Sequence, residues 1–418
     1  MRIPGDEWIS DWNAAADRER SLCVAWLMNP GDPPRQNVRL TVCGTLVSET
    51  TGVADDEQSD VIPCVLIPRL MNAHTHLEFS DLRKPLQPAE PFTDWIRAVI
   101  HYRRDHAPDG VSGIRRGLGE CARNGTSFVG EITTTAESEA AYHSEAGVDV
   151  LSFRELIGFL PEQIDSQLAA ASAHLAKDAE PGISRGLSPH APYSVHPDLF
   201  AAAVELAALH DVPVAMHLAE TRDELQLLQN GTGRFVDFLR ELGIWRPDVI
   251  AADSAPLRYL EKLSHLRASL VVHGNHLSDN ELRFLCRNPH VATVYCPRTH
   301  GYFGHTLHPW KKLVAGGATV LIGTDSRASN PDLSLWKELQ HLARLPDTLP
   351  WPRLLQLATT VPSAALQRNH QPLRAGNPAD GVLIACEADS EGQLNSALAE
   401  PSSQPIAVLC HGTLTSSA

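Results

Sequence analysis

The stretch from residue 65 to residue 76 reads Val-Leu-Ile-Pro-Arg-Leu-Met-Asn-Ala-His-Thr-His. Its apolar first half, Val65–Leu70, predicts a buried β-strand. Because side chains alternate along a strand, His74 and His76 would lie on the same side and could bind one ion together. The pair alone is weak support for a metal site, since the chain holds 20 histidines in 418 residues. Other ligands must join the pair before a site can be predicted.

Seven more short apolar runs follow, and stretches with helical spacing separate them. Helical stripes occur at 164–175, 235–242 and 335–342, and Ser278-Asp-Asn-Glu281 is a capping box that predicts a helix start. Eight βα units in about 300 residues predict an α/β fold, a (β/α)8 TIM barrel, over residues 67–368. The seven runs are Ser127–Ile132, Asp149–Phe153, Arg185–Ser188, Pro213–Met216, Ser269–Val272, Ala292–Tyr295 and Thr319–Ile322.

The two ends of the chain carry β-branched runs without intervening long helical patterns. Val38–Val42 and Gly44–Val47 lie near the N-terminus, and Gly381–Ala385 and Pro405–Leu409 lie near the C-terminus. Neither end alone could bury both faces of a sheet. We therefore expect residues 1–66 and 369–418 to form one small β-sandwich-like domain beside the barrel.

Composition narrows the class of protein. Hydrophobic residues make up 43% and charged residues 20%, which excludes a disordered or fibrous chain. The 35 Lys and Arg against 50 Asp and Glu give a net charge of −15, so we expect a small-molecule partner and neither nucleic acid nor a membrane. There is no signal-like N-terminus or membrane-length apolar run, and the eight cysteines are scattered. A cytoplasmic protein with reduced thiols is expected.

Further polar residues stand where the predicted strands end, which is where a barrel builds its active site. The fifth, sixth and eighth runs lead into His217, His273 and Asp325. His217 and Asp325, added to the first histidine pair, make a nitrogen and oxygen ligand set that suits zinc or iron(II) with a position left for water.

Glu220 follows His217 by three residues and would lie near the metal without binding it. There it could pass a proton from the metal-bound water to a leaving group. Alone, Glu220 could equally be a solvated residue that opens the next helix. His273 could polarise the water or hold the reacting atom, with a structural role at the barrel rim as the alternative. The neighbouring ligands favour the catalytic interpretation of both residues.

These segments together resemble the amidohydrolase superfamily, in particular its metal-dependent deaminase and chlorohydrolase branch. The resemblance covers nearly the whole chain. It is carried by Pro68–Glu78, His217–Glu220, Val272–Leu277, Gly323–Ser326 and Ala375–Asp380.

The resemblance implies a function and a set of roles. A hydroxide on the metal would attack a ring carbon that bears an exocyclic amine, and ammonia would leave. The implied ligands are His74, His76, His217 and Asp325. Glu220 is implied as the acid and base and His273 as a neighbour of the bound water, while Asp325 also accepts a proton from the water. His190 and Tyr193 are implied to face the substrate.

One ion is expected, zinc first and iron(II) as the alternative. Two-metal members of the superfamily generally bridge their ions with a modified lysine at the end of strand 4. The lysines here are Lys84, Lys177, Lys262, Lys311, Lys312 and Lys337, and none stands there.

Residues 72–80, 92–96 and 296–298 are most similar to 6-aminodeoxyfutalosine deaminases, whose substrate carries an adenine amine and a benzoate. Arg298 could bind such a carboxylate in a bidentate way, or could form a salt bridge within the rim. Trp95 and Tyr302 could stack on a flat heterocycle, or could simply pack. The segment after Arg298 departs from the pattern: it holds a cluster of His300, His305 and His308, which could contact metal or substrate but is more typical of solvated loop histidines.

The sequence leaves alternatives open. The main hypothesis is hydrolytic deamination of an amino-substituted heterocycle, purine-nucleoside-like. A chlorohydrolase or cyclic amide hydrolase on the same scaffold differs mainly in its leaving group. A catalytically inactive binding protein is disfavoured, since every ligand position holds a competent residue. The oligomeric state stays open, with a homodimer as one alternative.

Overall fold

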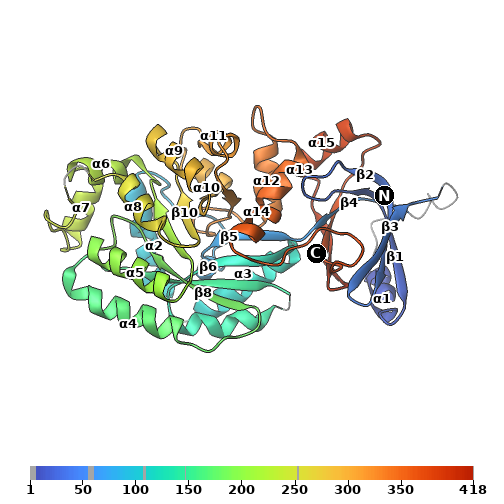
Figure 1. Ribbon diagram of the computed structural model, residues 1–418, viewed down its shortest axis with the longest axis horizontal. Coiled ribbons are helices and arrows are strands. Elements are labelled where there is room, and N and C mark those ends of the chain that lie inside the picture. Colours follow the sequence, from blue (N-terminus) through green and yellow to red (C-terminus); the bar gives the residue numbers. More distant parts are fainter. Residues whose placement is uncertain (1–5, 55–60, 107–109, 146, 252–253, 418) are drawn as a thin grey trace.

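The computed structural model describes residues 6–54, 61–106, 110–145, 147–251 and 254–417. Two sheets organise this part of the chain: a ring of eight strands wrapped by helices, and a seven-stranded sheet beside it (Figure 1). Both chain ends lie on the side of the seven-stranded sheet, at the right of the figure. The predicted barrel with a small β domain built from both termini is confirmed.

The eight barrel strands are parallel and neighbour one another in chain order. The ring closes between its last and first strands, where the Asp325 amide donates to the His74 carbonyl at 3.0 Å. The hydrogen bond that closes the barrel therefore joins two of the predicted metal ligands, His74 and Asp325. The strands are β5 (Leu70–Thr75), β6 (Thr126–Thr133), β7 (Asp149–Leu156), β8 (Ile183–Pro189), β9 (Val214–Leu218), β10 (Ser269–His273), β11 (Val291–Tyr295) and β12 (Val320–Ile322).

The predicted first strand, Val65–Leu70, falls mostly outside the barrel. Residues 65–68 belong to β4 (Ile62–Pro68) of the other sheet, and the first barrel strand begins at Leu70. Val65 and Ile67 pack into the core shared with the barrel, while Leu66 packs into the core of the terminal sheet. A strand buried on both faces is a continuous apolar run, so its sequence looks like that of a parallel barrel strand.

The terminal sheet has the order β15-β14-β13-β4-β1-β2-β3. Its strands pair antiparallel except for β1 and β4, which are parallel. The helix α1 (Asp6–Ala14) covers part of it through Trp12. Besides β4, the strands are β1 (Glu19–Leu27), β2 (Arg35–Cys43), β3 (Leu46–Gly52), β13 (Gly381–Ala385), β14 (Pro405–Cys410) and β15 (Thr413–Ser416).

The predicted helical stripes are confirmed as α4 (Ile164–Leu175), α7 (Arg234–Glu241) and α12 (Leu335–Ala343). Ser278 caps α9 (Asp279–Arg287) as predicted, with the Glu281 carboxylate accepting from the Ser278 amide at 2.6 Å. The other helices are α2 (Phe92–His106), α3 (Gly110–Arg123), α5 (Pro197–Leu209), α6 (Arg222–Asn230), α8 (Pro256–Leu263), α10 (Pro297–Tyr302), α11 (Trp310–Ala315), α13 (Trp351–Leu357), α14 (Thr360–Ala365) and α15 (Glu391–Ala399), with 3₁₀ turns at Leu77–Phe79, Ala136–Ser144 and Pro161–Gln163.

Two further expectations concern the whole chain. Within the described ranges, no helix combines the length and apolar character that a membrane span requires. No disulfide joins the eight cysteines in the part of the chain that the structure describes.

Candidate metal centre and active site

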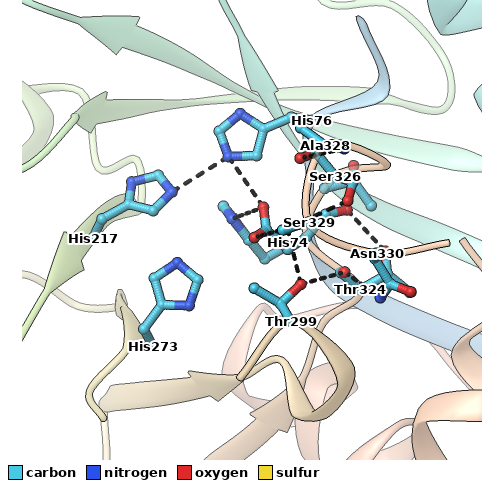
Figure 2. A network of polar contacts seen from close by, with 12 residues as sticks. His74, His76, His217, His273, Thr299, Thr324, Ser326, Ala328, Ser329 and Asn330 are labelled. Atoms are coloured by element: carbon cyan, nitrogen blue, oxygen red, sulfur yellow. Dashed lines mark hydrogen bonds and ion pairs between the residues drawn. The ribbon is translucent and has the colours of Figure 1, made fainter. Parts of the chain in front are cut away.

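The four expected metal ligands meet at the carboxyl ends of three barrel strands. His74 lies in β5 and His76 just after it, His217 lies in β9, and Asp325 follows β12. All four are buried, with at most 8% of their surface exposed. Figure 2 shows the rings of His76 and His217 pointing toward a common space beside His74. The Nε2 atoms of His76 and His217 are 3.3 Å apart, and Asp325 Oδ1 lies 3.6 Å from His74 Nε2 and 3.7 Å from His76 Nε2.

These donor atoms fit a divalent cation. His74 Nε2 is buried and has no hydrogen-bond partner among the described residues. His217 Nδ1 donates to the His190 carbonyl at 3.1 Å, so His217 Nε2 keeps its lone pair. Burial, together with neighbouring imidazoles, lowers the pKa of His76 and His217 well below the usual value and keeps both rings neutral. Neutral imidazoles with one carboxylate are a ligand set for zinc or iron(II).

Asp325 is oriented by its surroundings. Ser329 Oγ donates to Asp325 Oδ2 at 2.8 Å, which leaves Oδ1 facing the histidines. Burial alone raises the pKa of Asp325, but the nearby His74 ring, with smaller contributions from His273 and Ser329, outweighs burial and lowers it. The carboxylate is therefore ionised and has one oxygen available to a cation.

The backbone adopts left-handed conformations where three strands end. Ala219, His273 and Asp325 have φ values of 54°, 70° and 58°. Residues other than glycine seldom adopt such values, because the Cβ crowds the backbone. Strain of this kind tends to collect at functional sites, where the surrounding structure holds it in place.

Glu220 and His273 form a buried pair beside the ligands. Glu220 Oε1 lies 3.3 Å from His273 Nε2, and the residues are 4% and 3% exposed. Burial, followed by the charges of Asp325 and Glu224, raises the pKa of Glu220 well above its usual range, which favours the protonated carboxyl group. Burial lowers the pKa of His273 to about 3. The pair combines a carboxyl group that tends to keep its proton with a neutral imidazole.

Glu224 holds the turn that carries Glu220, and it is not among the residues predicted from the sequence. Its carboxylate accepts from the amides of Ala219 at 2.7 Å and Glu220 at 2.9 Å. The Thr221 side chain caps α6 by accepting from the Glu224 amide. The spacing Thr221-x-x-Glu224 is the sequence signature of a capping box and could have drawn attention to Glu224.

A cavity of about 270 Å³ opens in front of the metal ligands, and three of the expected substrate-facing residues line it. They are His190, Tyr193 and Trp95. The Tyr193 ring stacks on Phe235 with centroids 4.1 Å apart. His190 Nδ1 lies 2.6 Å from Ser194 Oγ, and burial lowers the pKa of His190 to about 3.

Arg298 and Tyr302 are not brought to this cavity. The Arg298 guanidinium makes a bidentate ion pair with Asp332 at 2.7 and 3.1 Å, so it has the rim salt bridge that was the alternative to substrate binding. The Tyr302 hydroxyl donates to the Leu86 carbonyl. The Tyr302 ring packs against Phe303, which places it in the packing role.

The structure adds Arg103 and Glu155 to the cavity wall. Arg103 Nη2 lies 2.6 Å from Glu78 Oε1 and 3.6 Å from Glu155 Oε2. Glu155 stands just after the predicted third strand, so the rule that strand ends carry the site could have found it. Arg103 lies in α2, so the rule that active-site residues follow strand ends could not have identified it.

Two of the three histidines after Arg298 are buried, contrary to the favoured expectation, and His305 is half-buried. His300 and His308 are 8% and 7% exposed. His308 Nε2 donates to the His273 carbonyl at 2.7 Å, its Nδ1 accepts from the Trp310 amide at 2.9 Å, and its ring stacks on Tyr295. Imidazoles that carry such hydrogen bonds can pack in the interior.

Comparisons with known proteins agree with this geometry. The family model described as the amidohydrolase family matches residues 65–415. The chain is similar to an aminodeoxyfutalosine deaminase of Deinococcus radiodurans, with 30% identity over 67% of this chain and 68% of that protein.

Two solved structures share the fold. The aminofutalosine deaminase of Helicobacter pylori in complex with methylthio-coformycin has a TM-score of 0.80 at 18% identity, and covers 95% of this chain and all of its own. An adenosine deaminase of Xanthomonas campestris with bound zinc has a TM-score of 0.73 at 22% identity, covering 94% and 92%.

Proposed function

The chain belongs to the amidohydrolase family and is a hydrolase of carbon–nitrogen bonds, and we propose that it deaminates an adenine nucleoside. The observation that carries this proposal is the Glu220–His273 pair, 3.3 Å apart, in the cavity that three of the four metal-ligand candidates, His76, His217 and Asp325, also line. A deaminase must give a proton to a poor leaving group, and a buried carboxyl with a raised pKa can do so at neutral pH.

The proposed cofactor is one divalent ion held by His74, His76, His217 and Asp325. When bound, such an ion polarises a water molecule and lowers the pKa of that water. Zinc is the first choice, with iron(II) as the alternative; the adenosine deaminase with the similar fold contains zinc.

The side chains of this protein would then move protons at defined atoms. The ionised Asp325 carboxylate accepts a proton from the attacking water, whose oxygen bonds to the ring carbon that bears the amine. Glu220 supplies the proton with which the amine leaves as ammonia when the carbon–nitrogen bond breaks. The neutral His273 ring holds its Nε2 beside Glu220 Oε1 and keeps the acid oriented.

The rest of the proposed substrate site surrounds the ring. Tyr193 and His190 form one wall, and Trp95 contributes an aromatic face to the cavity. The D. radiodurans relative is named for aminodeoxyfutalosine. Arg298, the residue expected to bind the carboxylate of that compound, is bound to Asp332 instead. The proposal therefore extends to adenine nucleosides as a class and no further.

The test is ammonia release by metal-replete protein from adenosine, 5′-deoxyadenosine, 5′-methylthioadenosine, aminodeoxyfutalosine, cytosine and a chlorotriazine. We expect turnover of at least one adenine nucleoside, with equal amounts of ammonia and the corresponding hypoxanthine nucleoside. Silence from every amine, with release of chloride from the triazine, would contradict the proposal and favour the chlorohydrolase alternative.

A further inference from the structure

The outer part of the active-site cavity is an apolar cup. Its wall comes from α2, from α7 and the residues that follow it, and from the loop after β7. We define the cup by six of the side chains that line the cavity: Ile96, Ile100, Ile157, Phe238, Leu242 and Ile244.

Three side chains of the cup are unusually exposed for their size. Ile100 and Ile157 are 41% exposed and Leu242 is 46% exposed. They are three of the six large hydrophobic residues that are exposed in the described chain, and all three line this one cavity. Exposed apolar side chains that gather at one place mark a surface that a ligand or partner covers. Because these three side chains line the active-site cavity, we infer that the substrate itself covers them.

The charges around the cavity are unfavourable for an anionic substituent. Apart from Glu220 and Asp325, which belong to the proposed catalytic centre, its described lining residues include the Glu155 carboxyl group, and the cation among them is Arg103. Arg103 is already bound to Glu78 at 2.6 Å and lies 3.6 Å from Glu155. A substrate carboxylate in the cup would lose its hydration, and these residues offer it no cation that is not already paired with a carboxylate of the protein.

The nearby Arg97 is committed as well. Its Nη1 lies 2.6 Å from Asp94 Oδ1, and its Nε donates to Glu241 Oε1 at 3.3 Å. Its guanidinium lies 5.1 Å from the centroid of the Phe238 ring. Arg97 thus links α2 to α7, which lie on either side of the cup, and its positive charge is paired with Asp94 and Glu241.

We propose that the substrate carries, at the end opposite to its amine, an uncharged apolar substituent of several carbon atoms that fills this cup. The inference rests on the proposed deaminase function and names its substrate class: adenine nucleosides with an apolar group in place of a carboxylate at the distal position.

A matched set of nucleosides tests the proposal. The set is 5′-benzylthio-5′-deoxyadenosine, the same compound with a para-carboxylate on the benzyl ring, and 5′-methylthioadenosine. We expect kcat/KM for the benzylthio compound to exceed that of the other two by about tenfold or more, since each group that fills an apolar pocket contributes about that factor. Equal or faster turnover of the carboxylate would overturn the inference and leave the deaminase function intact. Silence from all three, with turnover of another adenine nucleoside such as adenosine, would overturn the inference alone. Silence from every adenine nucleoside would contradict the deaminase function itself.

A variant of the cup provides a second test. Leu242→Arg places a cation at the exposed rim of the cup, and Leu209→Arg is its control, because Leu209 is 81% exposed and does not line the cavity. We expect Leu242→Arg to shift the ratio of kcat/KM values toward the carboxylate compound by about tenfold. Leu209→Arg should leave the ratio unchanged. Equal ratios in the two variants would count against the cup as the seat of the distal group.

Discussion

Glu220 is the residue on which the proton chemistry of this account depends. The Glu220→Gln side chain keeps its shape but cannot give up a proton to the leaving amine. We expect ammonia release to fall by about 10²- to 10⁴-fold, with metal content unchanged. The control is Glu205→Gln, on the exposed face of α5. Undiminished turnover by Glu220→Gln would show that another group protonates the amine.

His308 is placed to hold His273 in position, and no sequence pattern predicted this role. Its hydrogen bond to the His273 carbonyl, at 2.7 Å, supports a residue with φ of 70°. We expect His308→Ala to lower kcat by about 10- to 100-fold while metal content stays the same, since neighbours that orient a metal site contribute on this scale. His210→Ala, at an exposed position after α5, is the control. A variant that lost metal in proportion to activity would argue for a general structural role instead.

The sequence was sufficient to locate residues whose position follows from the order of the barrel strands. It was not sufficient for residues whose position depends on a side-chain partner far away in the sequence. His74, His217 and Asp325 could be found because the ends of parallel strands meet at one rim. Arg298 stands after a strand too, but Asp332, 34 residues later, takes its guanidinium. No local pattern around Arg298 indicates that partner.

At the scale of elements, the closure of the barrel depends on the small size of Gly323. A Cβ at this position would lie 2.9 Å from His74 Cβ and 3.1 Å from the His74 backbone N and O. We expect Gly323→Ala to push β12 from β5, to lower the free energy of unfolding by about 1–3 kcal/mol and to weaken metal binding. Gly392→Ala is the control, since a Cβ there meets no atom within 4 Å. Equal unfolding free energies and metal affinities in the two variants would contradict this account of the closure.

The start of α12 is tied to the barrel rim by an ion-pair network with a defined pH dependence. Burial alone raises the pKa of Asp332, but hydrogen bonds and charges from Arg298 and Lys337 outweigh it and lower the pKa to about 2. A carboxylate whose pKa is lowered in the folded state stabilises the fold at pH values above its pKa in the unfolded state, which is near 4. This stabilisation is lost as the pH falls from about 4 to about 2.

We therefore expect Asp332→Asn to lower the free energy of unfolding by about 2 kcal/mol near pH 7, and the gap to wild type to narrow below about pH 4. Denaturant unfolding at several pH values measures this. Asp237→Asn, whose side chain is 76% exposed, should have little effect at any pH. A gap that stayed constant down to about pH 2 would contradict the shifted pKa.

For the molecule as a whole, the sequence predicted a barrel and a β domain shared by both chain ends, but it assigned Val65–Leu70 to the barrel, whose first strand begins at Leu70. The reason lies in Val65, Leu66 and Ile67, which alternate between two cores. A strand that separates two cores has no polar face, and local patterning then cannot tell which sheet it joins. Hydrogen bonding to β1 and β13 decides that question, and those strands come from opposite ends of the chain.

The central claim is that one metal ion, held by His74, His76, His217 and Asp325, serves the deamination of an adenine nucleoside. Its most direct test is a titration of metal-free protein with zinc, in which ammonia release from the best nucleoside and bound metal are measured together. We expect activity to rise in proportion to the bound metal and to reach its maximum at one ion per chain. Full activity without metal, or a maximum reached only at two ions per chain, would contradict this claim.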